Sequence, residues 1–160
     1  MRSFLYGLLA AALILPARPA LAAPEPPPSG YERAVAAVPA RHWLLVQQAS
    51  IDRSSGGQAR RSTRSIHLTP GGAAGQLHHE VGHIVAYSDP ALEADWRRTF
   101  WPNGRPAGVL PSAYARTNDR EDFAETYRLM IERGCVEDRE RTAFMLARVF
   151  HQREVPPCRD

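Results

Sequence analysis

The feature that most limits how this chain can fold is the short sequence His79-Glu80-Val81-Gly82-His83. Residues four apart on an α-helix lie one turn apart on the same face, so His79 and His83 would project side by side. Two imidazoles in that arrangement can bind one metal ion, and this HExxH spacing is typical of helical zinc sites. Glu80, rotated by about 100° from His79, would border the same cleft as a general base. The pattern therefore predicts a helix with a metal site on one face.

The opposite face of this predicted helix is apolar. Leu77, Val81, Ile84 and Val85 lie on the side away from the two histidines. His78 is about a quarter-turn from the pair, so we expect it at the surface or at the rim of the cleft. The helix should pack through one face and bind metal through the other.

A catalytic zinc site needs a third protein ligand and an open position for water. One candidate is Asp89, which follows His83 by six residues, the spacing at which metzincin peptidases place their third ligand. Those families have glycine three residues after the second histidine, where the backbone turns sharply, and this chain has Ala86 there. Asp89 is therefore the weaker candidate.

Glu121 is the stronger candidate for the third ligand. It lies in the first turn of a predicted helix over about 118–133, and Glu125 follows one turn later on the same face. Two stacked carboxylates repel each other unless a cation lies beside them, and a zinc ion would supply that charge. We expect Glu121 to bind the metal and Glu125 to accept the free ring N–H of a ligand histidine. The competing interpretation is a solvated acidic face paired with Arg128.

The N-terminal 22 residues have the features of a secretory signal peptide. Arg2 supplies the charged start, residues 5–15 the short apolar region, and Ala20-Leu21-Ala22 the cleavage site. Residues 23–30 contain four prolines in eight residues and are expected to form an extended linker. The domain would then span 31–160, in a secreted or periplasmic protein with no stable membrane insertion after cleavage.

Charge and cysteine content constrain the partners and the compartment. Removal of residues 1–22 takes away two arginines and leaves 18 basic against 17 acidic residues, a formal charge of +1, which does not indicate nucleic-acid binding. The two cysteines, Cys135 and Cys158, lie far from the HExxH motif and outside any CxxC pattern. In an oxidising compartment we expect them to form a disulfide.

Apolar periodicity and breaker residues predict the remaining elements. In chain order, we expect a short helix over about 29–37, strands over 42–47 and 65–68 with a turn at 54–57 between them, the metal-binding helix to about 88, a helix that buries Leu92, Trp96 and Phe100, a surface loop over 102–111, a helix over 118–133 and a last helix over 137–152. Segment 62–68 is the expected edge strand, which would bind an extended peptide through its backbone. The predicted fold is a small zincin-like α+β domain, mostly helical, with a short sheet whose edge strand lines the active-site cleft.

Three segments together resemble a known family. The stretch Ser112–Asn118 runs into Glu121–Glu125 and then Tyr127–Met130, and with the HExxH motif their order and register are similar to the catalytic domain of anthrax lethal factor. That gluzincin-type group also includes small secreted Pro-Pro endopeptidases. The similarity covers about residues 67–132. Asp122 departs from the aromatic residue that the family usually has at this position.

The resemblance implies a role for each matching residue. It implies His79, His83 and Glu121 as ligands of one Zn2+ per chain, Glu80 as general base, Tyr114 as hydrogen-bond donor in the transition state, and Glu125 behind the ligands. The expected function is that of a secreted zinc endopeptidase acting on a peptide or protein. The alternative is a secreted binding module with a vestigial zincin site, against which the intact Glu80 argues.

Overall fold

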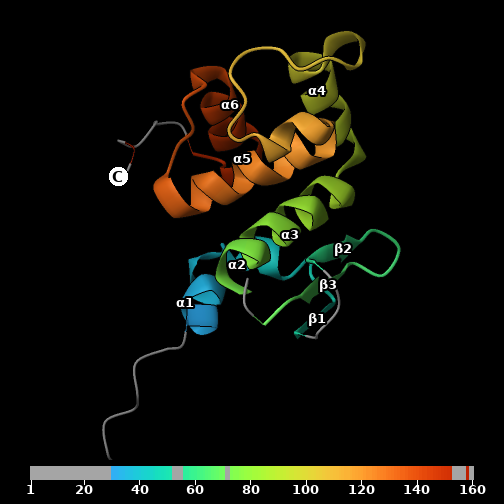
Figure 1. Ribbon diagram of the computed structural model, residues 1–160, viewed down its shortest axis with the longest axis vertical. Helices are drawn as coiled ribbons and strands as arrows, with labels where there is room; N and C mark the ends of the chain where they lie inside the picture. Colours follow the sequence, from blue (N-terminus) through green and yellow to red (C-terminus); the bar gives the residue numbers. More distant parts are fainter. Residues whose placement is uncertain (1–29, 52–55, 71–72, 153–157, 159–160) are drawn as a thin grey trace, which may run out of the picture.

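The computed structural model describes residues 30–51, 56–70, 73–152 and 158 (Figure 1). The predicted signal peptide, the predicted linker except Gly30, and positions 54 and 55 of the predicted turn lie outside these ranges. The domain division is therefore still a prediction.

The described part is a mostly helical α+β domain. Its elements, in chain order, are α1 (Gly30–Ala37), α2 (Ala40–Trp43), β1 (Gln48–Ile51), β2 (Gln58–Arg60), β3 (Ser65–Leu68), α3 (Ala73–Ser88), α4 (Pro90–Phe100), the 3-10 helices η1 (Pro102–Gly104) and η2 (Tyr114–Thr117), α5 (Asp119–Arg133), α6 (Arg139–Phe144) and the π-helical segment η3 (Met145–Phe150). Helix α3 runs through the middle of the molecule, with α1 and the sheet on one side and α4, α5 and α6 on the other (Figure 1). The fold class predicted from the sequence is confirmed.

The three-stranded sheet has the order β1-β3-β2, with β3 parallel to β1 and antiparallel to β2. The expectation that segment 62–68 forms the edge is wrong, because β3 is the central strand. Its apolar residues Ile66 and Leu68 are fully buried, which a position between two strands and against α3 explains. Strand β2 is the edge that lies beside α3.

Residues 42–47 do not form the predicted strand. The chain forms α2 and then a turn in which the Leu45 amide donates to the His42 carbonyl at 3.1 Å. The buried His42 ring has its Nδ1 2.9 Å from the Tyr127 hydroxyl and its Nε2 3.1 Å from the Val149 carbonyl oxygen. The helical turn lets this buried imidazole use both ring nitrogens, which buried polar groups require. Strand β1 begins directly after this segment.

The predicted helices are present, with one division. The Asn118 side chain caps α5 by accepting from the amides of its first turn, and Gly134 ends the helix in the left-handed region at φ 84°. Helix α4 buries the three apolar residues predicted for its core face, Leu92, Trp96 and Phe100. The last predicted helix, 137–152, is divided into α6 and η3.

Helices α3 and α5 pack closely because α3 has a glycine at the contact. A Cβ added at Gly82 would lie 3.0 Å from both the Ala124 Cα and the Tyr127 Cβ, closer than nine in ten real Cβ contacts. The two residues between Glu80 and His83 therefore contribute to helix packing. Gly82 allows the close approach of α5, and Val81 is fully buried. This contact brings the polar faces of the two helices together.

A buried ion pair holds the first turn of α5 from the other side. The side chains of Asp122 and Arg141 are both 0% exposed, and Nη2 of Arg141 donates to Oδ2 of Asp122 at 2.9 Å. Trp101 Nε1 donates to the same carboxylate at 2.8 Å, and Arg141 Nη1 donates to the Ala107 carbonyl at 2.8 Å. The aspartate at this atypical position is thus a buried anchor between α5, α6 and the loop that follows α4.

Candidate metal centre

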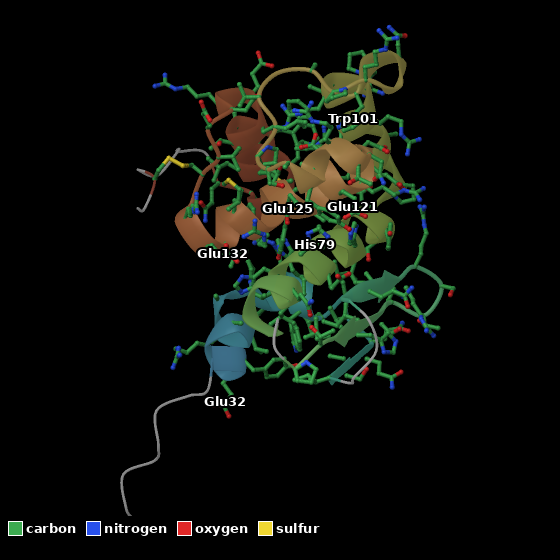
Figure 2. The ribbon with its side chains drawn as sticks, viewed as in Figure 1. Glu32, His79, Trp101, Glu121, Glu125 and Glu132 are labelled. Carbon is green, nitrogen blue, oxygen red and sulfur yellow. A yellow bond between two sulfur atoms is a disulfide. The ribbon has the colours of Figure 1, made fainter. Side chains whose placement is uncertain are left out.

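The structure brings His79 and His83 of α3 together with Glu121 of α5. One ligand atom from each lies within 4.8 Å of the other two. His79 Nε2 is 3.0 Å from Glu121 Oε2 and 3.1 Å from His83 Nε2, and His83 Nε2 is 3.3 Å from the same Oε2. Figure 2 shows His79 and Glu121 where the two helices meet. Both histidines are buried, and the Glu121 side chain is 18% exposed.

These three atoms fit the donor set of a zinc site. Ligands at about 2.0–2.1 Å from a tetrahedral zinc ion are about 3.3 Å apart, close to the separations of 3.0 to 3.3 Å observed here. Two imidazole nitrogens and one carboxylate oxygen leave the fourth position for water. Binding of the ion itself stays a prediction.

Glu125 lies directly behind His79, as predicted. Its Oε1 is 2.9 Å from His79 Nδ1, so it accepts the Nδ1 proton and leaves Nε2 directed at the cluster. This contact fixes the tautomer that a metal ligand needs. Arg128 also pairs with Glu125, at 3.0 Å, so the pairing expected for a purely solvated face coexists with the contact to His79.

The ionisation of the cluster depends on its histidine–carboxylate contacts. Burial lowers the pKa of His79, but hydrogen bonds with Glu121 and Glu125 outweigh burial and raise this pKa to about 9. Burial raises the pKa of Glu121, whereas hydrogen bonds from His79 and His83 lower it to about 2. Against burial, hydrogen bonds from His79 and Arg128 hold the pKa of Glu125 well below its usual range. Without metal, His79 is therefore a positively charged imidazolium at neutral pH, with both ring nitrogens protonated.

Glu80 faces a cleft of about 440 Å³ that also reaches His79. Its carboxylate accepts a hydrogen bond from the backbone N–H of Ala59 on the edge strand β2. A Cβ at Gly57 would collide with Oε1 of Glu80, so glycine at this position allows the close approach. Burial raises the pKa of Glu80, although the two histidines oppose the effect. A carboxylate with a raised pKa in the cleft has the properties of a general base.

Tyr114 stands at the rim of the same cleft, at the start of η2. It is 56% exposed, and its ring centroid is 5.7 Å from that of His79. Partial burial raises the pKa of Tyr114, and the charges of Glu121 and Glu80 add to the effect. The hydroxyl therefore stays protonated, as a hydrogen-bond donor must.

Two other candidates have different roles. Asp89 caps α4, because its Oδ1 accepts from the amides of Ala91 and Leu92 at 3.0 and 3.1 Å, and it does not belong to the metal-ligating group found in the described residues. His78 is buried and not at the rim as expected, because its Nε2 lies 3.0 Å from the Ala34 carbonyl oxygen of α1. It is also outside the metal-ligating group.

Sequence reasoning missed two residues beside the cluster. Gly57 was assigned only to a turn, although it admits the Glu80 carboxylate. Tyr87 was not singled out, although its ring stacks on His83 with centroids 5.7 Å apart and an interplanar angle of 15°. The signal for Tyr87 was its position four residues after His83, one helical turn away.

The C-terminal part of the chain contains the predicted disulfide between Cys135 and Cys158, whose Cα atoms are 5.3 Å apart. The pair closes a sequence separation of 23 residues. Among the helices of the described ranges, none has both the length and the apolar character needed to cross a bilayer.

Fold and cluster together define a class: a small, mostly helical α+β domain with a buried His-His-Glu group consistent with a zincin-like metal site. Comparisons with models of protein families, with curated proteins and with solved structures found no match. Any assignment beyond this class therefore depends on the residues themselves.

Proposed function

We propose that the chain is a secreted or periplasmic zinc endopeptidase that binds one Zn2+ and hydrolyses a peptide or protein substrate. The observation that carries the proposal is the position of Glu80, an unligated carboxylate in the same cleft as the ligand-like His79. A site that only stored metal would have no use for such a base. The resemblance to the catalytic domain of anthrax lethal factor, from residues 67 to 132, supports the same chemistry. The predicted signal peptide and the disulfide support the location.

The chain's own groups would act on the two ends of the reacting bond. His79, His83 and Glu121 would hold the zinc ion, which would supply the Lewis acidity for activating water and polarising a peptide carbonyl. Glu80 accepts the proton of the attacking water and then transfers it to the leaving amine. Tyr114 donates its hydroxyl proton in a hydrogen bond to the carbonyl oxygen as negative charge develops there.

The edge strand β2 offers a way to orient the substrate. It is only three residues long, and its Ala59 amide donates a hydrogen bond to Glu80. An extended peptide laid along this edge would form backbone hydrogen bonds and place its scissile bond near Glu80. In this proposal, strand β2 replaces segment 62–68 as the edge that binds an extended peptide.

The proposal is tested by zinc content and by cleavage of an unbiased peptide library. The mature protein should bind about one zinc per chain and cleave a subset of the library. Glu121→Ala should lower zinc affinity far more than Asp89→Ala, which only removes a helix cap. Equal losses, or a loss confined to Asp89→Ala, would contradict the ligand assignment.

Glu80→Gln is the matched control for catalysis. Glutamine keeps the shape and reach of the side chain but cannot accept the proton, so the variant should retain zinc and fold while turnover falls roughly 10²- to 10⁴-fold. Undiminished turnover would show that Glu80 is not the base. A wild-type protein that binds zinc but cleaves nothing would favour the binding module.

A further inference from the structure

Arg128 forms a bridge between two carboxylates on α5. Its Nε and Nη2 donate to Oε1 and Oε2 of Glu125, both at 3.0 Å, and its Nη1 donates to Oε2 of Glu132 at 2.7 Å. Glu132 in turn lies 3.4 Å from Nδ1 of the buried His78. Figure 2 shows Glu125 and Glu132 spaced along the same helix. The guanidinium thus binds both glutamates, and its contact with Glu125 is a bidentate fork of two hydrogen bonds.

This fork acts on the carboxylate of Glu125, which contacts His79 of the metal-ligating group. Oε1 of Glu125 is shared between Arg128 and His79 Nδ1, which lies 2.9 Å away. The terminal torsion of a glutamate is broad, so a carboxylate held at one oxygen could rotate away from the imidazole. A bidentate guanidinium fixes the carboxylate plane, which a point charge would not do.

The two histidines of the cluster differ in how they are held. Nδ1 of His83 is buried without a hydrogen-bond partner in the described structure, and that ring rests on Tyr87 by stacking. His79 is the one whose Nδ1 is oriented by a carboxylate. Loss of the contact between Arg128 and Glu125 would therefore affect His79, because it is the histidine of this pair whose Nδ1 is held by a carboxylate.

We propose that Arg128 is a positioning residue for the metal centre, which holds Glu125 in the orientation that directs Nε2 of His79 at the ion. This inference rests on the proposed function, since it presupposes a bound metal. Partners behind metal ligands typically change metal affinity by about 10- to 100-fold when removed. The same range is expected for loss of Arg128.

Two other roles for Arg128 give different results. The side chain also lines the cleft, and a contact with substrate would change KM while zinc affinity stayed the same. A purely structural role, through its ion pairs along α5, would lower the unfolding midpoint of the metal-free protein without a specific loss of zinc affinity.

The experiment compares Arg128→Met with Arg133→Met in the mature chain. Arg133 lies on the same helix but is exposed, and it is not among the described residues that line the cleft. Zinc affinity is measured by competition with a chelating dye, and folding of the metal-free proteins by thermal unfolding. Arg128→Met should bind zinc about 10- to 100-fold more weakly, and Arg133→Met should match wild type. Arg128→Lys, which keeps the charge without the fork, should recover little of the loss and serves if the methionine variant does not fold.

Glu125→Gln shows whether Arg128 acts through Glu125. In that background, Arg128→Met should cause little further loss, because the fork has no carboxylate left to orient. Unchanged zinc affinity in Arg128→Met, full recovery in Arg128→Lys, or an additive loss in the double variant would overturn the inference. Wild-type protein without zinc affinity would overturn the proposed function and this inference together, whereas zinc binding without peptide cleavage would overturn only the peptidase assignment.

Discussion

Replacement of Asp122 by alanine should be among the most destabilising single changes in this domain. The variant removes both hydrogen bonds of the pair, from Arg141 Nε at 3.1 Å and from Nη2 at 2.9 Å. It leaves a guanidinium with 0% exposure, which still donates hydrogen bonds to the Ala107 carbonyl and the Asp138 carboxylate, at 2.8 and 2.9 Å. Trp101 Nε1 also loses its acceptor.

The magnitude follows from the cost of removing one carboxylate from a buried cation. Loss of one partner of a buried ion pair costs about 3–5 kcal/mol, and Asp138, whose side chain is 11% exposed, keeps a single hydrogen bond with the Arg141 guanidinium where Asp122 had two. With a urea m-value of about 2 kcal/mol per molar, the midpoint of unfolding should fall by about 2 M. Since domains of this kind have about 5–15 kcal/mol of stability, the variant should still fold.

The assay is urea unfolding of metal-free, disulfide-intact protein, followed by tryptophan fluorescence. Arg141→Met alone should cost a similar amount, because it leaves the buried Asp122 carboxylate without its cation. The double variant should be more stable than the sum of the two losses predicts, by at least about 2 kcal/mol. Additive losses, or a loss below about 1 kcal/mol for Asp122→Ala, would refute the view that this pair anchors α5.

At neutral pH, zinc binding should release about one proton, because the pKa of His79 is raised to about 9 in the metal-free protein. Calorimetry in two buffers of different ionisation enthalpy measures the number of protons released, and a value near zero would contradict this expectation. Burial lowers the pKa of His42 to about 4, so its contribution to stability is complete above about pH 6.5 and is lost as the pH falls to about 4, by up to about 3 kcal/mol. Urea unfolding of wild type and His42→Gln should show that the variant lacks this part of the pH dependence. Tyr114→Phe should lower turnover roughly 10²- to 10³-fold with little change in KM, because the hydroxyl acts mainly in the transition state; full turnover would show that Tyr114 is not the donor.

The sequence predicted the His79, His83 and Glu121 group because the information for each helix is local. His79 and His83 share a helix, and the stacked pair of Glu121 and Glu125 follows from the 3.6-residue period of another. A zinc site with two histidines needs a third protein ligand. A pair of carboxylates on one helix face is the strongest candidate for it in this sequence. The polar faces of α3 and α5 were therefore predictable without knowledge of how the two helices pack.

The sequence was a poor guide where burial depends on distant segments. Residues 42–47 have the apolar, branched composition of a strand, yet His42 is drawn into the core by partners on α5 and η3. Strand β3 was recognised, but its central position depends on pairing with β2, a strand too short to show a pattern. The role of Gly57 likewise depends on a carboxylate more than twenty residues away in the chain.

The groups that would hold the metal and those that would border the substrate come from different kinds of segment. The ligand-like side chains lie on α3 and α5, whose spacing is set by the contact at Gly82, whereas Gly57 lies just before β2 and Tyr114 begins the short 3-10 helix η2. Under the proposed function, changes of length or composition around Gly57 and Tyr114 would alter which peptides enter while leaving the ligand geometry in place. Substrate selectivity could then evolve separately from metal binding, and a laboratory library for new specificities should vary the residues that flank Gly57 and Tyr114.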